Sequence, residues 1–309
     1  MATTATAESH PDGGAPGTFR PYRGRFAPSP TGRLHIGSLV AALGSALDAR
    51  SRRGTWLVRM EDVDSPRVLP GCADEILRTL EIFGFEWDGP VLYQSTRTDA
   101  YAAALASLRE LRLTFECSCS RALLHDDAED SAYPGTCHAG PTRPGPTATR
   151  FRIDARTTER FEDRIRGPCQ IALGRLGDVV VRRKDNLFAY QLAVVVDDEA
   201  QGITDVVRGA DLLDSTAWQR ALQRALRYGT PTYGHLPLIT EPDGAKLGKS
   251  RHSLPLDPSE VPAALTHALA LLGQAPPAAL ARASRREVWD WALAHWQPGN
   301  AAHGPHPPL

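Results

Sequence analysis

Lysine is scarce in this sequence. Among 309 residues, only three of the 35 lysines and arginines are lysines. Two of them, Lys246 and Lys249, stand within one five-residue stretch, Lys246–Ser250. A chain that uses arginine for most positive charges keeps lysine where a compact ammonium group suits a site better than a planar guanidinium. The stretch is therefore a candidate functional segment.

A long apolar run and a secretion signal are also missing. No 18 consecutive residues are apolar, so we expect no membrane span. Residues 1–20 lack the apolar core of a signal peptide and are expected to form a disordered tail, which predicts a cytoplasmic protein. Five cysteines, an odd number, argue against a disulfide framework in such a chain.

Two common nucleotide-binding motifs are absent as well. Neither GxGxxG nor the Walker A pattern GxxxxGK[ST] occurs. The composition is that of a globular protein, with 42% hydrophobic and 23% charged residues. A net charge of −1 neither indicates nor excludes a nucleic-acid partner, because one basic face can be balanced elsewhere.

Strand and helix patterns alternate along the first part of the chain. Strand patterns at 22–26 and 55–60 flank a helical pattern at 34–53, and helical patterns follow at 74–83 and 98–111. This alternation is typical of an α/β fold with a parallel, Rossmann-like sheet and helix crossovers.

The alternation breaks at residue 117. Residues 117–167 are rich in proline, glycine, cysteine and charge, and we interpret them as a loop-rich insertion. Regular structure is expected again at 179–181 and 192–196, as a helix at 215–228, as a strand at 236–239 and as two helices within 259–296.

The segment Arg25–Gly37 joins the first strand to the first helix through a turn rich in proline and glycine. In a parallel sheet, such a turn lies at the carboxyl end of the strand, where ligands bind. The helix N-terminus offers free N–H groups to a phosphate. His35 can donate a hydrogen bond to a phosphate oxygen, and Gly32 and Gly37 permit close backbone approach. Alone, His35 also fits a capping or surface histidine.

Two segments together resemble the signature motifs of class I aminoacyl-tRNA synthetases. His35–Ser38 (HIGS) is similar to the HIGH motif of that family, and Lys246–Ser250 (KLGKS) is similar to its KMSKS motif. Ala27–Gly32 (APSPTG) resembles the form found in the glutamyl and glutaminyl subgroup. Gly248 departs from the serine that many relatives carry, but both lysines are kept.

This resemblance implies a reaction. The carboxylate of glutamate attacks the α-phosphorus of ATP and pyrophosphate leaves, with Mg²⁺ on the triphosphate. The resemblance assigns catalysis to His35, Lys246 and Lys249, and ATP binding to His35, Gly37 and Lys249. These groups would stabilise the negative charge that grows on the phosphoryl oxygens.

Glutamate carries two carboxylates and one ammonium, so its site needs cations and an anion. Arginine holds a carboxylate with two parallel hydrogen bonds, and two buried arginines, Arg25 and Arg208, would be costly without a ligand between them. By residue type alone, Glu61, Asp62 and Asp64 are all alternatives for the ammonium. The resemblance selects Glu61 and gives the full glutamate-binding set as Arg25, Ala27, Ser29, Glu61, Tyr190 and Arg208.

Three cysteines of the insertion suggest a metal site. Cys117 and Cys119 would face the same side of a strand, and with Cys137 they would leave one position of a tetrahedral zinc site to fill. Free buried thiols are an equal alternative, and His125 and His138 compete for the fourth position. A resemblance to the glutamyl-Q tRNA(Asp) synthetases implies three cysteines and Tyr133 around one structural zinc ion.

Only 59 residues follow Ser250, too few for the anticodon-binding domain of a full glutamyl-tRNA synthetase. The resemblance therefore implies tRNA-independent activation of glutamate, then its transfer to the queuosine base in the anticodon of tRNA(Asp). We expect a monomer. The alternatives are an atypical glutamyl-tRNA synthetase that charges the 3′ end, a non-catalytic relic and a nucleotidyltransferase acting on another small acid.

The expected domain organisation follows from these assignments. It comprises a disordered tail at 1–20, the first half of the catalytic domain at 21–116, a zinc-binding and acceptor-type insertion at 117–178, the second half with the KMSKS-like loop at 179–255, and a C-terminal helical stem and tail at 256–309.

Overall fold

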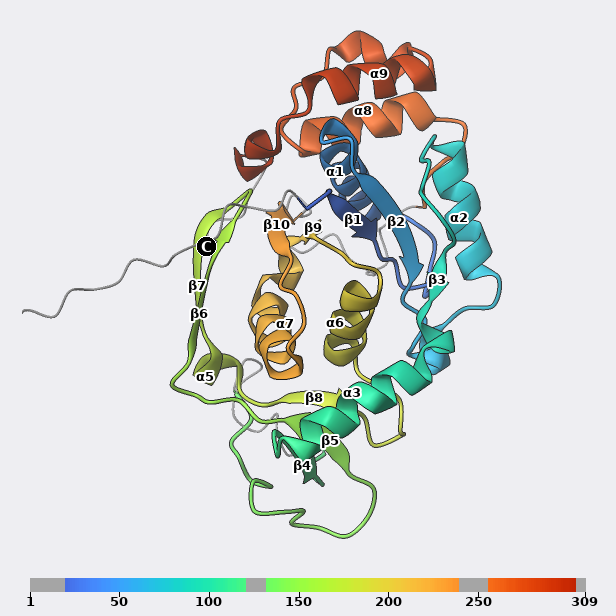
Figure 1. The fold of residues 1–309 in the computed structure, drawn as a ribbon. Helices are drawn as coiled ribbons and strands as arrows, with labels where there is room; N and C mark the ends of the chain where they lie inside the picture. Colours follow the sequence, from blue (N-terminus) through green and yellow to red (C-terminus); the bar gives the residue numbers. More distant parts are fainter. Residues whose placement is uncertain (1–19, 121–131, 239–254, 304–309) are drawn as a thin grey trace, which may run out of the picture.

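The computed structural model describes residues 20–120, 132–238 and 255–303. Its centre is a set of parallel strands in two hydrogen-bonded groups (Figure 1). The first group has the order β1-β2-β3, all parallel. Its strands are β1 (Arg23–Phe26), β2 (Thr55–Met60) and β3 (Leu92–Tyr93). The expected parallel α/β sheet is thereby confirmed.

The second group has the order β7-β6-β10-β9 and extends the first. Its strands are β6 (Thr158–Asp163), β7 (Gly167–Ala172), β9 (Asp205–Gly209) and β10 (Thr232–Leu236). β10 runs parallel to β9 and β6, and β7 returns antiparallel. The two groups meet where the Thr204 N–H, just before β9, donates to the Arg23 carbonyl of β1 at 2.9 Å. The meeting of β1 and β9 is a topological switch point, the usual place for a ligand in such sheets.

Helices cover this sheet, and further helices pack at one end of the molecule. They are α1 (Ile36–Ser51), α2 (Cys72–Ile82), α3 (Thr98–Glu110), α5 (Leu173–Leu176), α6 (Tyr190–Ala200), α7 (Leu213–Leu226), α8 (Val261–Leu271) and α9 (Arg285–His295). Short 3₁₀ turns occupy Ser65–Arg67, Gln94–Thr96, Ala210–Leu212, Ala278–Arg282 and Pro298–His303. α8 and α9 pack at the α1 end of the molecule, as the two helices expected within 259–296 (Figure 1). None of the helices in the described ranges is long and apolar enough to cross a membrane.

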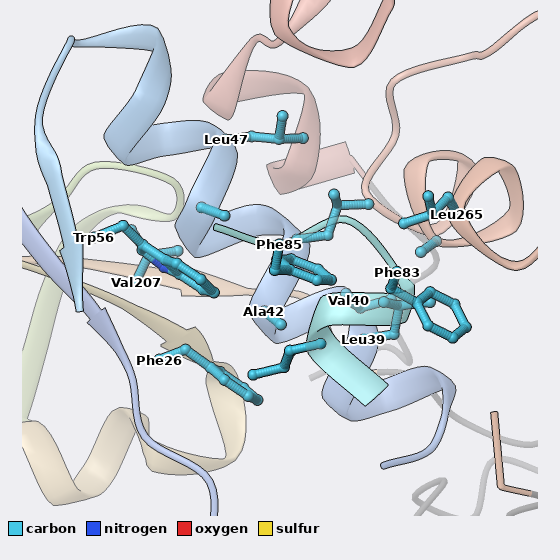
Figure 2. Close-up of a cluster of buried hydrophobic side chains, with 14 of the residues drawn as sticks. Phe26, Leu39, Val40, Ala42, Leu47, Trp56, Phe83, Phe85, Val207 and Leu265 are labelled. Carbon is cyan, nitrogen blue, oxygen red and sulfur yellow. The ribbon is translucent and has the colours of Figure 1, made fainter. Parts of the chain in front are cut away.

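The main core lies between α1, the first strands and the C-terminal helices (Figure 2). Leu39, Leu43 and Leu47 recur at helical spacing on α1 and are buried, and all residues of Ala42–Ala49 are buried with them, so this helix is enclosed on every side. Trp56 stacks between Phe26 and Phe85, with ring centroids 6.4 and 5.6 Å away. This packing fixes β1 against α1 and so positions the turn between them.

A small antiparallel sheet lies at the opposite end of the molecule from α8 and α9 (Figure 1). It has the order β4-β5-β8, with β4 (Thr114–Cys117), β5 (Ala148–Phe151) and β8 (Val179–Arg182). α3 leads into β4, so this sheet is tied directly to the main domain.

Three details of the secondary-structure prediction were wrong. The loop-rich stretch does not reach residue 167, because β5 and β6 lie within it, and β9 was not predicted at all. Four of the six residues of β6 are charged, which hides the strand pattern, and its Glu159 is buried with ion pairs to Arg220 and Arg224. The last strand spans Thr232–Leu236 and starts earlier than the predicted 236–239, of which residue 239 lies outside the described residues; buried Tyr233 and His235 interrupt its apolar pattern.

Candidate functional site

A cavity of about 650 Å³ lies at the carboxyl ends of the central strands. Ser29, Glu61, Tyr190, Cys117 and Cys119 are among the residues that line it. The other lining residues are Val63, Asp64, Arg67, Gln94, Ser120, Ala148, Arg150, Val180, Arg183, Lys184, Asp185, Phe188 and Ala189. The volume is in the range of small-molecule sites, and the mixture of apolar walls and few charged groups is typical of them.

Arg25 and Arg59 share one carboxylate behind this cavity. Asp198 of α6 lies 3.2 Å from Arg25 Nε and 2.8 Å from an Arg59 terminal nitrogen, and all three are buried. Burial acts to raise the pKa of Asp198, but the charges of Arg25 and Arg59 outweigh it and hold the pKa below its usual range. Arg25 therefore already has one carboxylate partner within the protein, and whether it also contacts a ligand stays a prediction.

Glu61 follows β2 directly and offers an unsatisfied oxygen. Its backbone N–H donates to the Pro28 carbonyl at 2.9 Å, which ties it to the turn after β1. Its side chain is 9% exposed, and Oε1, 3.5 Å from Arg59, makes no hydrogen bond among the described residues. Burial raises the pKa of Glu61, and the charges of Arg59 and Arg25 lower it only in part. A buried carboxylate in this condition suits a cationic ligand group.

The two neighbouring acids are engaged elsewhere. Asp62 accepts from the backbone N–H of Ser95 at 2.8 Å and from its hydroxyl at 2.6 Å. Asp64 pairs with Arg183 at 3.0 Å and with Arg67. Of the three alternatives left open by the sequence, Glu61 is the one that lies beside the buried arginines Arg59 and Arg25.

Arg208 of β9 is held by uncharged groups. Its terminal nitrogens donate to Gln219 Oε1 and Thr216 Oγ1, both at 2.8 Å, and to the Tyr190 hydroxyl at 3.4 Å. Its Nε donates to His235 Nε2 at 3.3 Å. Arg208 is 5% exposed, and no carboxylate in the described ranges forms an ion pair with it. An arginine buried in this way is suited to an anionic ligand.

A buried dyad supports Arg208 from behind. His235 Nδ1 lies 2.5 Å from Asp163 Oδ2, which leaves His235 Nε2 as the acceptor for Arg208. Burial and the charge of Arg208 lower the pKa of His235, although Asp163 acts against this. The imidazole therefore stays neutral at physiological pH and orients Arg208 without adding charge.

His35 is the N-cap of α1. Its Nδ1 accepts from the Gly37 N–H at 3.1 Å, and Ser38 completes the capping box. A neutral ring that accepts at Nδ1 carries its proton on Nε2, the tautomer that can donate to a phosphate oxygen. The cap interpretation and the phosphate interpretation are therefore compatible in one side chain.

Lys246 and Lys249 lie outside the described residues, as does His125. The first described residue after them, Pro255, forms an antiparallel bridge with His35. The next residue, Leu256, donates from its N–H to the Leu34 carbonyl at 3.0 Å. The chain that follows the lysine-containing stretch thus returns to the start of α1.

The cysteines predicted as metal ligands converge. The sulfur atoms of Cys117, Cys119 and Cys137 all lie within 4.8 Å of one another, and those of Cys119 and Cys137 are 3.7 Å apart. The Tyr133 hydroxyl is 3.4 Å from Cys117 Sγ and 3.9 Å from Cys119 Sγ, and accepts from the Cys137 N–H at 2.8 Å. His138 Nε2 is instead 2.5 Å from Asp178 Oδ2. The structure thus places Tyr133, not His138, beside the three sulfurs.

Sequence reasoning missed Asp198, Arg59, Asp163 and His235. One signal was available: Asp197 and Asp198 end an apolar helical run, where an acid must find a buried partner. The others gain their meaning from contacts between strands distant in sequence. Ala27 and Ser29, which were predicted, follow β1 directly, and Ser29 reaches the cavity.

Several known proteins are similar to this chain in sequence and in fold. The family described as class I tRNA synthetases (E and Q), catalytic domain, matches residues 22–290. Glutamyl-Q tRNA(Asp) synthetases of Dechloromonas aromatica and Pseudomonas aeruginosa are 56% and 54% identical, over 89% of this chain and 94% and 93% of their own. The glutamate-tRNA synthetase of Elizabethkingia anophelis shares the fold with a TM-score of 0.77 at 24% identity, and covers 93% of this chain and 68% of its own.

Proposed function

Because this chain belongs to the class I tRNA synthetases of the glutamyl and glutaminyl type, and among them to the glutamyl-Q tRNA(Asp) synthetases, we propose that it activates glutamate with ATP and transfers it to the queuosine base of tRNA(Asp). One observation carries the amino-acid assignment. Arg208, buried without a carboxylate partner in the described ranges, and Glu61, with an unsatisfied buried oxygen, belong to one cluster of charges.

Glutamate fits this cluster by charge. Its ammonium pairs with Glu61, and one carboxylate pairs with Arg208, whose guanidinium is held in place by neutral supports. Arg25, fixed by Asp198, serves the second carboxylate. Tyr190, at the start of α6, connects the cavity to Arg208 through its hydroxyl.

The activation step forms one bond and breaks one. The α-carboxylate oxygen of glutamate bonds to the α-phosphorus of ATP, which enters as its magnesium complex, and the bond to the bridging β-phosphate oxygen breaks. Glutamyl-adenylate and pyrophosphate result. His35 Nε2 and the N-terminus of α1 stabilise the charge on the phosphate oxygens, together with Lys246 and Lys249.

The transfer step consumes the adenylate. A hydroxyl oxygen of queuosine bonds to the activated carbonyl carbon, and the bond from that carbon to the AMP oxygen breaks. The hydroxyl proton leaves with the departing phosphate group, so an ester and AMP are the products. The alternative, an atypical glutamyl-tRNA synthetase, would catalyse the same first step and would differ in the acceptor hydroxyl.

We also propose one structural zinc ion at Cys117, Cys119, Cys137 and Tyr133. Zinc–sulfur bonds of about 2.3 Å in a tetrahedron put sulfur atoms about 3.8 Å apart, close to the observed spacing of this cluster. When bound, zinc would cross-link β4 to the chain around Cys137, which has little core of its own. The ion takes no part in either reaction step.

Glutamate-dependent ATP–pyrophosphate exchange tests the proposed activity. The protein should catalyse exchange with no tRNA present, because every group proposed to bind glutamate is supplied by the chain itself. Exchange only after tRNA is added would favour the glutamyl-tRNA synthetase alternative. Silence under both conditions would refute glutamate activation.

The pH dependence should report Glu61. Since burial raises the pKa of Glu61, this carboxyl loses its charge above the usual value of 4.5 as pH falls. A neutral Glu61 cannot pair with ammonium, so kcat/KM for glutamate in exchange should fall on the acid side, at a pH above 4.5. Glu61→Gln should lower kcat/KM at neutral pH and lose this limb. The same limb in both proteins would assign it to another group.

A further inference from the structure

Two orphaned acceptor oxygens line the cavity beyond Glu61. Asp64 Oδ1 and Gln94 Oε1 are both buried, and neither has a hydrogen-bond partner among the described residues. Gln94 is 0% exposed, and its amide nitrogen donates to Asp197 at 2.9 Å, which fixes the amide so that the oxygen is the unpaired end. Buried polar atoms without partners are uncommon and costly, so these two indicate a ligand.

The missing partner must be a donor. Ionised carboxylate and amide oxygens only accept hydrogen bonds, so the ligand group carries an O–H or an N–H. The ammonium of glutamate already has Glu61, which stands three residues before Asp64. The acceptor in the proposed transfer step reacts through a hydroxyl, so its hydroxyl groups fit this requirement.

The cavity also carries positive side chains. Arg150, Arg183 and Lys184 line it. Lys184 donates to the Ser118 carbonyl at 2.7 Å, and Arg183 lies between Asp64 and Asp185, so both are held in place. Fixed cations of this kind suit a phosphate. A single nucleotide presents both features, a phosphate and hydroxyl groups.

We propose that the cavity holds the extruded queuosine nucleotide, with Asp64 and Gln94 accepting hydrogen bonds from the hydroxyls of its cyclopentenediol. This rests on the proposed function and names the acceptor part of that site. A base displaced from its stack into a pocket is the general solution for enzymes that modify bases. The diol then lies beside the end where Glu61 and Tyr190 place the activated glutamate.

Binding discrimination tests the proposal. The dissociation constants for tRNA(Asp) carrying queuosine and for the same tRNA carrying guanosine are measured at one salt concentration. The wild type should prefer the queuosine form. Asp64→Ala should reduce this preference about tenfold, the effect of one lost hydrogen bond to a charged acceptor. Asp64→Asn, which keeps an acceptor oxygen, should retain more of it.

The controls separate the diol site from the rest. Asp154→Ala removes an exposed acid that also pairs with a nearby arginine but lies outside the cavity, and should keep the full preference. Glutamate-dependent exchange should stay within about twofold of wild type in Asp64→Ala, because the amino-acid site is untouched. Gln94→Met provides an independent second variant if Asp64→Ala does not fold.

Two results would overturn the inference. An unchanged preference in the Asp64 or Gln94 variant would mean that water, not the diol, satisfies these oxygens. A parallel fall of glutamate-dependent exchange and of glutamate transfer to the tRNA would place the residues in glutamate activation. A wild type without exchange is a distinct result, because it removes the proposed function itself.

Discussion

Arg208→Ala should raise the KM for glutamate in the exchange reaction by about 100-fold or more. A ligand carboxylate buried without its charged partner loses about 3 kcal/mol or more. Thr216, Gln219 and His235 hold this guanidinium in place before glutamate arrives, so the loss includes a preorganised contact. Since the contact is made before and during reaction, kcat should change much less than KM.

Two matched variants make this result interpretable. Arg208→Lys keeps the charge but loses the planar fork, and should give an intermediate KM. Arg175→Ala removes a surface arginine, 59% exposed and paired with Asp214, and should leave KM unchanged. A threefold or smaller change in folded Arg208→Ala protein would exclude a direct contact with the substrate carboxylate.

Metal content should divide the five cysteines into two classes. The wild type should contain about one zinc per chain. Cys119→Ser and Cys137→Ser should lose it, because each removes one sulfur of the cluster. Cys72→Ser and Cys169→Ser should retain it, since neither residue belongs to the cluster. Elemental analysis of the purified variants checks both classes.

Chelation tests what the ion does. Structural zinc can supply on the order of 10 kcal/mol of folding free energy to a small unit, and the cluster around Cys117 has few other apolar contacts. Removing the metal should therefore speed hydrogen exchange in β4 far more than in α1, while glutamate-dependent exchange persists. A metal-free wild type with full protection in β4 would refute the zinc site.

The sequence predicted the parts of the site that follow local rules. Arg25 and Glu61 stand at the ends of predicted parallel strands, and His35 at the start of a predicted helix, so their approach follows from topology. Cys117 and Cys119 share a side because of the strand period. Local pattern placed these residues, but the resemblance to known synthetases was needed to select Glu61 over Asp62 and Asp64.

The remaining site residues depend on tertiary contacts. Asp198 reaches Arg25 from a helix 173 positions away in sequence, and Asp163 reaches His235 across 72 positions. No spacing rule links such pairs, and His235 even obscured its own strand by placing an imidazole in an apolar pattern. Their roles became visible only once the strands were assembled.

The arrangement around Asp198 bears on how this protein tells two similar amino acids apart. There, two guanidinium groups, Arg25 and Arg59, face two carboxylates, Asp198 and Glu61, and their charges cancel. Arg208 touches no carboxylate in the described ranges, because the neutral His235 separates it from Asp163. A substrate carboxylate would be the first anion in contact with this guanidinium, whereas the side-chain amide of glutamine, nearly identical in shape, brings no charge to it. We therefore expect discrimination against glutamine to depend on charge and not on size, and neutralising Arg208 is the change that would weaken it.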